Sequence, residues 1–280
     1  MLEDLLKAAI LGIVQGLTEF LPVSSTGHLI LAERVLRVDQ DRYGLSFDAA
    51  LHMGTLLALL VYFGKAWLNL GFGGLKTIRD RSFADPEGRL AWLIVLATIP
   101  AATLGFLFES TIEDAFRTPA LVATMLILFS AVFVAAEALG RQARTTGDLN
   151  WRDALFIGFA QAIALIPGTS RSGATISAGL VRDVKRQDAA RFAFLLSAPI
   201  IAGAGLKQMI TVVGDFADGT LGGDDAAFFA TGFIAAGIVG YISIAFLMRF
   251  LATNSLRPFV IYRVALGLLI FAVLGVQAIT

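Results

Sequence analysis

Residues 12–28 read GIVQGLTEFLPVSSTGH, and this stretch decides how the chain folds. An apolar helical segment ends at Pro22, a run of Ser, Thr and Gly follows, and the next apolar run is only about ten residues long. Each apolar segment is shorter than the roughly 20 residues that a helix needs to cross a bilayer. Half-length helices interrupted by Pro and Gly are typical of re-entrant hairpins. We therefore predict a hairpin over about residues 5–36, with two kinked full-length helices as the alternative.

The same pattern recurs in the second half of the chain, where residues 158–175 read GFAQAIALIPGTSRSGAT. The matched pairs, at offsets of about 140 to 146 residues, are Gly12 with Gly158, Gln15 with Gln161, Pro22 with Pro167, Gly27 with Gly173, and Asp48 with Asp188. A polar, Pro-containing loop that recurs in the same order indicates a duplicated unit. We predict a second hairpin over about residues 153–181. Irregular backbone at membrane depth must be buried in protein or line a cavity, so the two loops should meet between the halves.

The composition excludes a water-soluble fold. The sequence is 57% hydrophobic and only 16% charged, and its mean hydropathy is +0.77, far from the values of ordinary soluble domains. The net charge is zero and no basic run is present, which argues against a nucleic-acid partner. Without cysteine, any chemistry must use oxygen and nitrogen groups.

The predicted fold is an all-α polytopic membrane protein with two repeats, residues 1–140 and 141–280, in one integral-membrane domain. Beside its hairpin each repeat has three full transmembrane spans. The expected spans are 47–64, 90–108 and 119–139, then 188–208, 227–249 and 258–279. Because three is odd, the second repeat must have inverted topology.

The distribution of basic residues sets the expected orientation. One face would carry Lys65, Lys76, Arg79, Arg81, Arg89, Arg141, Arg144, Arg152, Arg182, Lys185, Arg186, Arg191, Arg249 and Arg257. The other would carry only Lys7, Arg34, Arg37, Arg42, Arg117 and Lys207, with acidic loops that include Glu109, Glu113 and Asp114. The positive-inside rule makes the first face cytoplasmic, so both termini are expected outside.

The first loop contains the acid–base groups. Glu19 and His28 lie in otherwise apolar segments, where a charge at the bilayer centre costs roughly 2.5–3.5 kcal/mol, so a functional role is the default. Gln15 and Glu19 share a helix face, and Ser25 and His28 are three residues apart on the next helix. The hydroxyl and glycine residues of this tip are Ser24, Ser25, Thr26 and Gly27.

The second loop has the composition of a phosphate cradle. Small hydroxyl residues and glycines before a helix N-terminus offer free backbone N–H groups, and the planar fork of Arg171 suits phosphate oxygens. The expected phosphate-binding residues here are Gly168, Thr169, Ser170, Arg171, Ser172 and Thr175, joined from the first loop by Ser24, Thr26 and Gly27. At an offset of 146, Leu165 stands in place of Glu19 and Ala174 in place of His28.

These motifs carry a resemblance to a known family. Gln15 to Glu19 resembles a Glu/Gln-x-x-x-Glu motif, and Pro167–Thr175 matches Pro-Gly-x-Ser-Arg-Ser-x-x-Thr. Together they resemble the bacterial undecaprenyl pyrophosphate phosphatases, the bacitracin-resistance family, along the whole chain. The resemblance implies hydrolysis of undecaprenyl diphosphate in the inner membrane, which recycles the carrier lipid of peptidoglycan synthesis. It also implies a site open to the periplasm and a divalent cation, Mg²⁺ or Ca²⁺.

Several roles stay open at this point. Glu19, with Gln15, is either the metal ligand or a base. The nucleophile is Ser25 activated by His28 or Glu19, or His28 itself, or a water activated by Glu19, and we favour Ser25 assisted by His28. A secondary transporter or lipid flippase is the alternative function, because inverted repeats around broken helices are also a transporter signature. Substrate and membrane lipids are the expected partners, and a homodimer is compatible with the sequence.

Two further polar residues receive structural interpretations. His52, at the start of an apolar span, is interpreted as a packed or interfacial histidine. Arg263 lies inside the last span, where its long side chain is expected to extend to the cytoplasmic surface.

Overall fold

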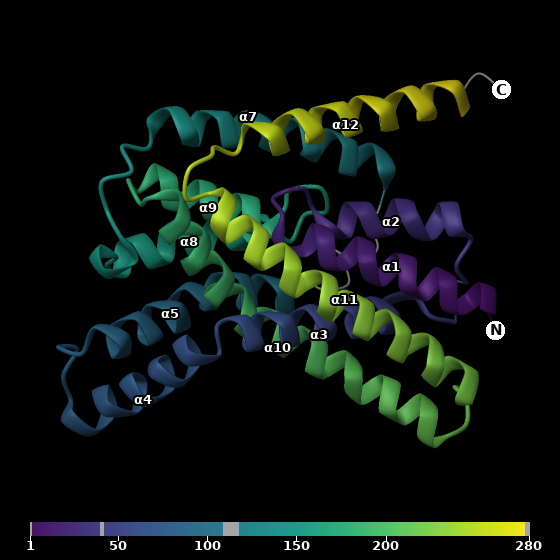
Figure 1. Ribbon diagram of the computed structural model, residues 1–280, viewed down its shortest axis with the longest axis horizontal. Coiled ribbons are helices and arrows are strands. Elements are labelled where there is room, and N and C mark those ends of the chain that lie inside the picture. Colours follow the sequence, from purple (N-terminus) through teal and green to yellow (C-terminus); the bar gives the residue numbers. More distant parts are fainter. Residues whose placement is uncertain (1, 40–41, 109–117, 278–280) are drawn as a thin grey trace.

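The computed structural model describes residues 2–39, 42–108 and 118–277, and in this part of the chain the structure is built from eleven α-helices and one short 3₁₀ helix, Thr146–Asp148 (Figure 1). The predicted loop charges Glu109, Glu113, Asp114 and Arg117 lie outside the described residues. The first helices are α1 Leu2–Phe20, α2 Ser25–Leu36, α3 Gly44–Tyr62, α4 Gly64–Asp80, α5 Pro86–Leu107 and α7 Pro119–Leu139. The later ones are α8 Trp151–Ile163, α9 Arg171–Val181, α10 Arg186–Ala217, α11 Gly223–Phe250 and α12 Arg257–Gln277.

Within the described ranges, six helices are long and apolar enough to cross a membrane: α3, α5, α7, α10, α11 and α12. They occupy the six stretches in which crossing spans were expected. The chain is therefore a multi-pass membrane protein. Helix α10 extends to Ala217, well beyond the expected end at residue 208.

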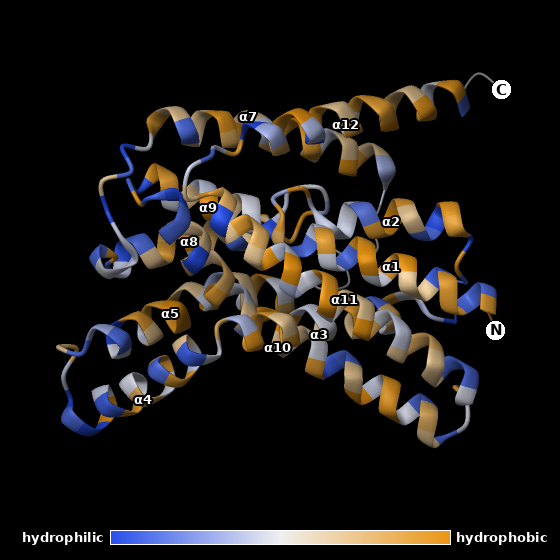
Figure 2. Ribbon diagram, in the orientation of Figure 1, coloured by the Kyte–Doolittle hydropathy of each residue, from blue (hydrophilic) through white to orange (hydrophobic). Residues whose placement is uncertain are grey.

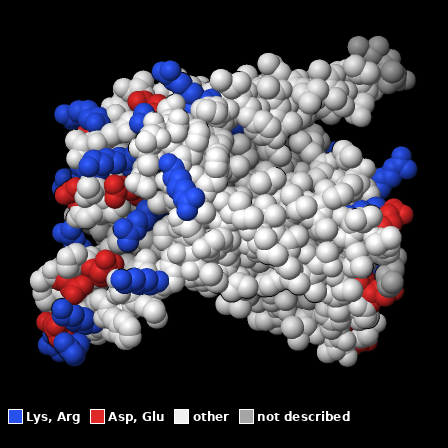
Figure 3. All heavy atoms as spheres, viewed as in Figure 1, with Lys and Arg blue, Asp and Glu red and all other residues white. Residues whose placement is uncertain are grey.

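The surface agrees with this assignment. Figure 3 shows a broad band without charged side chains between two charged ends, and in Figure 2 hydrophilic residues gather mainly at the helix ends. Large apolar side chains on α12 face outward, with Ile261 69% and Leu269 60% exposed. Exposed apolar surface on this scale marks contact with lipid or another apolar partner.

Helix α4 was not predicted. Its stretch contains Lys65, Lys76 and Arg79 and is too polar for a span, although its Leu68 and Phe72 lie on one exposed apolar face. The helix packs against α5 through glycines: a Cβ added at Gly73 would lie 2.5 Å from the backbone N of Gly88. The length and hydropathy of a full membrane span do not describe α4, because it is a shorter helix with one polar and one apolar face.

The helix pairs α1–α2 and α8–α9 reach the centre of the bundle with their connecting loops, which meet there (Figure 1). Helix α1, with 19 residues, is as long as α3 and longer than the half-length segment expected for a hairpin. The backbone N–H of Gly168 donates to Ser24 Oγ at 3.1 Å, and Ser172 Oγ donates to the Leu21 carbonyl at 3.2 Å. Helix α1 packs closely on α11 at Gly12, and α8 packs on α5 at Gly158. Loops that are far apart in the sequence are thus brought to one place.

Arg263 on α12 is buried where the two loops meet. The expectation that its side chain extends to the cytoplasmic surface was therefore wrong. Its side chain is fully buried and donates to the carbonyls of Gly168 at 2.9 Å and Met125 at 3.2 Å, with the Pro22 carbonyl at 3.5 Å. Its guanidinium also lies 4.7 Å from the centre of the Phe133 ring. A buried cation is tolerated here because backbone dipoles and a ring face replace its hydration.

Candidate active site

Glu19, in the last turn of α1, is the centre of the polar cluster. The residue is only 6% exposed. One carboxylate oxygen forms an ion pair with the guanidinium of Arg171. The other accepts hydrogen bonds from Ser25 Oγ at 2.6 Å and from Gln15 Nε2 at 3.2 Å. Because a buried carboxylate is costly unless it is paired, these partners explain how Glu19 stays ionised inside the bundle.

The backbone at Ser24 directs Ser25 toward Glu19. Pro22 ends the helical stretch, and Ser24 then adopts a positive φ of 77°, a left-handed conformation that L residues rarely take. Ser25 follows as the first residue of α2, with its hydroxyl turned back onto the carboxylate. Strained backbone of this kind gathers at functional sites.

The second loop repeats the turn and supplies the cation. Ser170 also has a positive φ, of 75°, and its Oγ caps α9 by accepting the N–H of Gly173 at 3.2 Å. Arg171 is the first residue of α9, and its side chain crosses to Glu19 of the first loop. The carboxylate of one loop and the guanidinium of the other are therefore direct partners.

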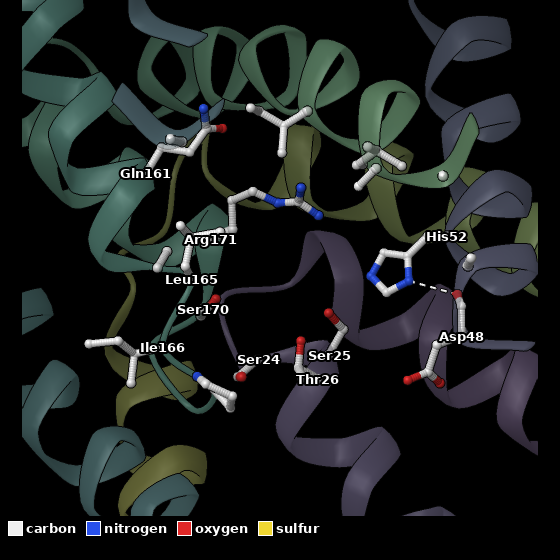
Figure 4. Close-up of a pocket in the computed structure, with 18 of the residues that line it drawn as sticks. Ser24, Ser25, Thr26, Asp48, His52, Gln161, Leu165, Ile166, Ser170 and Arg171 are labelled. Carbon is white, nitrogen blue, oxygen red and sulfur yellow. Dashed lines mark hydrogen bonds between the residues drawn. The ribbon is translucent and has the colours of Figure 1, made fainter. Parts of the chain in front are cut away.

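His52 on α3 belongs to this cluster, which the sequence interpretation missed. Its Nδ1 donates to the Asp48 carbonyl at 2.8 Å (Figure 4). Its Nε2 is thereby turned toward Glu19, whose nearer carboxylate oxygen is 3.5 Å away. A histidine within an apolar helix was the available signal. The contact could not be predicted from spacing, because His52 and Glu19 lie on different helices, α3 and α1.

His28 is held elsewhere. Its Nδ1 donates to the Ser24 carbonyl at 2.8 Å, and its Nε2 accepts from the Tyr262 hydroxyl at 2.6 Å, with the two rings stacked. The expected Ser25–His28 pair is not formed in this structure, because the Ser25 hydroxyl bonds to Glu19. A spacing of three residues puts Ser25 and His28 on the same side of α2. The direction of each side chain depends instead on its tertiary hydrogen-bond partners, Glu19 and Tyr262.

A cavity of about 330 Å³ lies in front of Glu19. Of the predicted site residues, it is lined by Ser24, Ser25, Thr26, Ser170 and Arg171, and His52 joins them (Figure 4). Apolar side chains, among them Ile201 of α10 and Leu165, line much of the rest, together with the polar side chains of Asp48, Gln161 and Gln208. Hydroxyls, a guanidinium and an imidazole thus face a pocket with largely apolar walls, as in many small-molecule sites.

The remaining predicted phosphate ligands do not line this cavity. The Thr175 hydroxyl donates to carbonyls of its own helix, and Ser172 bonds to the first loop. Gly168 has φ 94°, and a Cβ at Gly173 would lie 2.0 Å from Phe133 Cζ. Thr169, fully buried, and Gly27, which lies against Val122, also stay behind the cavity wall. The glycines therefore serve loop geometry and close packing.

The arrangement has the parts of a phosphoryl-transfer site. The Ser25 hydroxyl lies within hydrogen-bond distance of the Glu19 carboxylate, a geometry that can activate a serine for nucleophilic attack. Arg171 offers a permanent cation beside it, and α2 and α9 begin at Ser25 and Arg171, so both helix N-termini, which favour anions, lie at this cluster.

Comparison with known proteins agrees with this chemistry. The model of the family described as bacitracin resistance protein BacA matches residues 8–269. The chain belongs to this family. A protein of Rubrobacter xylanophilus is 49% identical over 97% of this chain and 98% of its own length. Proteins of Mycolicibacterium smegmatis, 44% identical with 96% of each chain covered, and Pelobacter propionicus, 43% identical with 94% and 95% covered, are also similar. All three are named undecaprenyl-diphosphatase.

The residues expected to bind a metal form a small set of oxygen ligands. Among the described residues, no group of three or more His, Asp or Glu side chains could hold a metal ion. Gln15 Oε1 is buried beside Glu19 without a hydrogen-bond partner in the described chain. An amide oxygen and a carboxylate fit a hard cation whose other ligands are water and substrate oxygens.

Proposed function

We propose that this chain hydrolyses undecaprenyl diphosphate to undecaprenyl phosphate and inorganic phosphate, and so returns the lipid carrier to peptidoglycan and envelope polymer synthesis. Family membership and the names of its relatives support the substrate and the reaction. The observation that supports the chemistry is the 2.6 Å hydrogen bond from Ser25 Oγ to Glu19 beside Arg171.

In the proposed mechanism Ser25 is the nucleophile and Glu19 is its base. Glu19 takes the hydroxyl proton as Ser25 Oγ attacks the terminal phosphorus. The new Oγ–P bond forms while the bond from phosphorus to the bridging oxygen breaks, and undecaprenyl phosphate leaves with that oxygen. A water then attacks the phosphoserine, inorganic phosphate leaves, and Ser25 recovers a proton. Glu19 lies behind Ser25 and outside the cavity lining, which suits a base better than a nucleophile.

Arg171 changes partner in this mechanism. Without substrate its guanidinium pairs with Glu19. A diphosphate presents more negative charge and a geometry that matches the guanidinium fork. Arg171 then stabilises the developing charge on phosphorus, with Ser24, Thr26 and Ser170 around the phosphates. Most of the catalysis of phosphoryl transfer comes from such positioning and charge stabilisation.

His52 has the better position of the two histidines for proton transfer. Its Nε2 faces Glu19 at 3.5 Å and its side chain is 25% exposed, so it connects the base with the cavity. His28 is bonded to Tyr262 and supports the turn at Ser24. We therefore assign His52 to accept and return the proton that Glu19 handles.

A divalent cation, Mg²⁺ or Ca²⁺, belongs to this proposal. Gln15 and Glu19 would hold it, and when bound it would neutralise charge on the diphosphate oxygens. Its support is the unpartnered Gln15 Oε1 beside the carboxylate. Loss of phosphate release on treatment with a chelator, and its return on adding Mg²⁺ or Ca²⁺, would test this assignment.

We also propose that residues 1–140 and 141–280 are inverted repeats with re-entrant hairpins at α1–α2 and α8–α9. Equivalent serines, Ser24 and Ser170, share the same unusual φ. Equivalent glycines, Gly12 and Gly158, make equivalent close contacts with a helix of the other half. These matches support a common ancestral unit.

The proposed orientation places the cavity on the periplasmic side and both termini outside. One end of the molecule in Figure 3 is rich in Lys and Arg, and α1 begins at the opposite end in Figure 1. The cavity extends to Leu45 and Asp48 in the first turns of α3, which begins near that same opposite end. The positive-inside rule supports this orientation.

Phosphate release from undecaprenyl diphosphate by the detergent-purified protein tests the function. The wild type should release phosphate, and Ser25→Ala should lose about 10²–10⁴-fold in kcat, the typical contribution of an activated catalytic group. Rapid quenching with terminally ³²P-labelled substrate should trap labelled wild-type protein and no labelled Ser25→Ala protein. Transport of the lipid without phosphate release would support the transporter alternative. A fully active Ser25→Ala would rule out Ser25 as the nucleophile, in favour of His28 if that variant is labelled and of water if neither protein is labelled.

A further inference from the structure

Gln161, on α8, is a buried polar residue that the mechanism above does not use. The residue is 2% exposed, yet it lines the cavity. Neither its Nε2 nor its Oε1 has a hydrogen-bond partner among the residues that the structure describes. In Figure 4, Gln161 and Arg171 enter the pocket from the side opposite His52 and Asp48.

The duplication explains why this amide lacks a partner. Gln161 occupies the position of Gln15 in the first repeat. Gln15 donates to the carboxylate of Glu19, four residues further along its helix, at 3.2 Å. In the second repeat the residue four positions on is Leu165, which offers no hydrogen-bond acceptor. Gln161 therefore has the helix position of Gln15 but no carboxylate neighbour, and unlike Gln15 it lines the cavity.

A buried amide without protein partners must bond to whatever occupies the cavity, because an unsatisfied buried polar group is costly. Its Nε2 carries two N–H donors, and phosphate oxygens are strong acceptors. Arg171, on the same side of the pocket, is already the cation assigned to those oxygens. A neutral amide beside a guanidinium adds directional donors without adding a charge that must be neutralised when the pocket is empty.

We propose that Gln161 is a substrate-binding residue whose amide N–H groups donate to the diphosphate next to Arg171. This assignment rests on the proposed diphosphatase function. It gives the two equivalent glutamines different tasks: Gln15 orients the carboxylate of Glu19, and Gln161 orients the phosphates.

The test is Gln161→Met, which keeps the length and volume of the side chain and removes both donors. With undecaprenyl diphosphate, KM should rise by about 10- to 100-fold, the usual effect of losing a hydrogen bond to a charged group, while kcat falls by less. The Ki of a non-hydrolysable isoprenyl methylene-diphosphonate should rise by a similar factor. The Tm should not fall, because no protein hydrogen bond is lost.

Gln187→Met is the matched control. Gln187 Nε2 donates to the Met248 carbonyl at 3.2 Å, away from the cavity, so this variant should lower the Tm slightly and keep the wild-type KM. If Gln161→Met had the KM and Ki of the wild type, or a lower Tm with an unchanged KM, Gln161 would be a packing residue and the inference would fail. Gln161→Leu provides a second variant if the Met protein does not fold. A wild type without phosphatase activity would instead refute the proposed function.

Discussion

The loop that joins α1 to α2 and the loop that joins α8 to α9 have closely similar turns but different chemistry. Each ends in a serine with positive φ, Ser24 or Ser170, directly before a helix N-terminus. The first loop follows a helix with a buried carboxylate, Glu19, where the second has Leu165. The second begins its helix with Arg171, where the first has Ser25.

If the two loops come from the duplication proposed above, this difference turned two related units into one asymmetric site. Backbone geometry is kept, because both turns must present a helix N-terminus to the same cavity. In the proposed mechanism the side chains differ because a nucleophile with its base and a cation for phosphate cannot occupy the same position. The ion pair between Glu19 and Arg171 connects the first loop with the second.

The largest effect should come from removing the carboxylate that distinguishes the first loop. Glu19→Gln keeps the size of the side chain but takes away the base and the partner of Arg171. We expect kcat for phosphate release to fall by about 10²–10⁴-fold. Glu3→Gln, an exposed carboxylate at the start of the same helix, is the control and should be fully active. Glu19→Gln with more than a tenth of wild-type activity would contradict the proposed division.

A smaller loss of activity should follow from removing Arg263, whose guanidinium contacts backbone carbonyls of both loops. Arg263→Met leaves the Gly168 and Met125 carbonyls without their donor, at about 1–3 kcal/mol for each unpaired group. We expect the Tm to fall by at least about 5 °C, and activity to fall because both loops lose their anchor. Arg257→Met, an exposed site at the start of the same helix, should melt like the wild type. Equal melting of both variants would show that Arg263 does not hold the junction.

The smallest effect is expected at His28, another residue that differs between the two loops, since Ala174 has the equivalent position. His28→Phe keeps the stacking on Tyr262 and loses two hydrogen bonds. Because His28 neither lines the cavity nor contacts Ser25, kcat should fall by less than about 10-fold, below the usual contribution of a general acid or base. His52→Phe, measured beside it, should have the larger loss. A larger loss of kcat in His28→Phe than in His52→Phe would assign the proton transfer to His28 and not to His52.

The six crossing helices could be predicted because length and hydropathy are sums over neighbouring residues. The same holds for the duplicated loops, whose order of Gly, Gln and Pro is visible without a structure. Helix α4 was missed because its amphipathic pattern falls below what a membrane span requires. The candidate site was predicted at these two loops, since Glu, Ser and Arg in apolar surroundings are conspicuous in any sequence.

The partners within the site depended on contacts between distant parts of the chain. Local spacing favoured a hydrogen bond between Ser25 and His28. In the folded chain Ser25 instead donates to Glu19, and His28 accepts from Tyr262. Packing also brought His52 to the carboxylate and buried Arg263 between the loops. The sequence alone determined that this is a polytopic membrane protein with two related polar loops, because burial in lipid selects residue types along the chain. Only the tertiary structure decided which side chains meet, because hydrogen-bond direction depends on helices that the sequence places far apart.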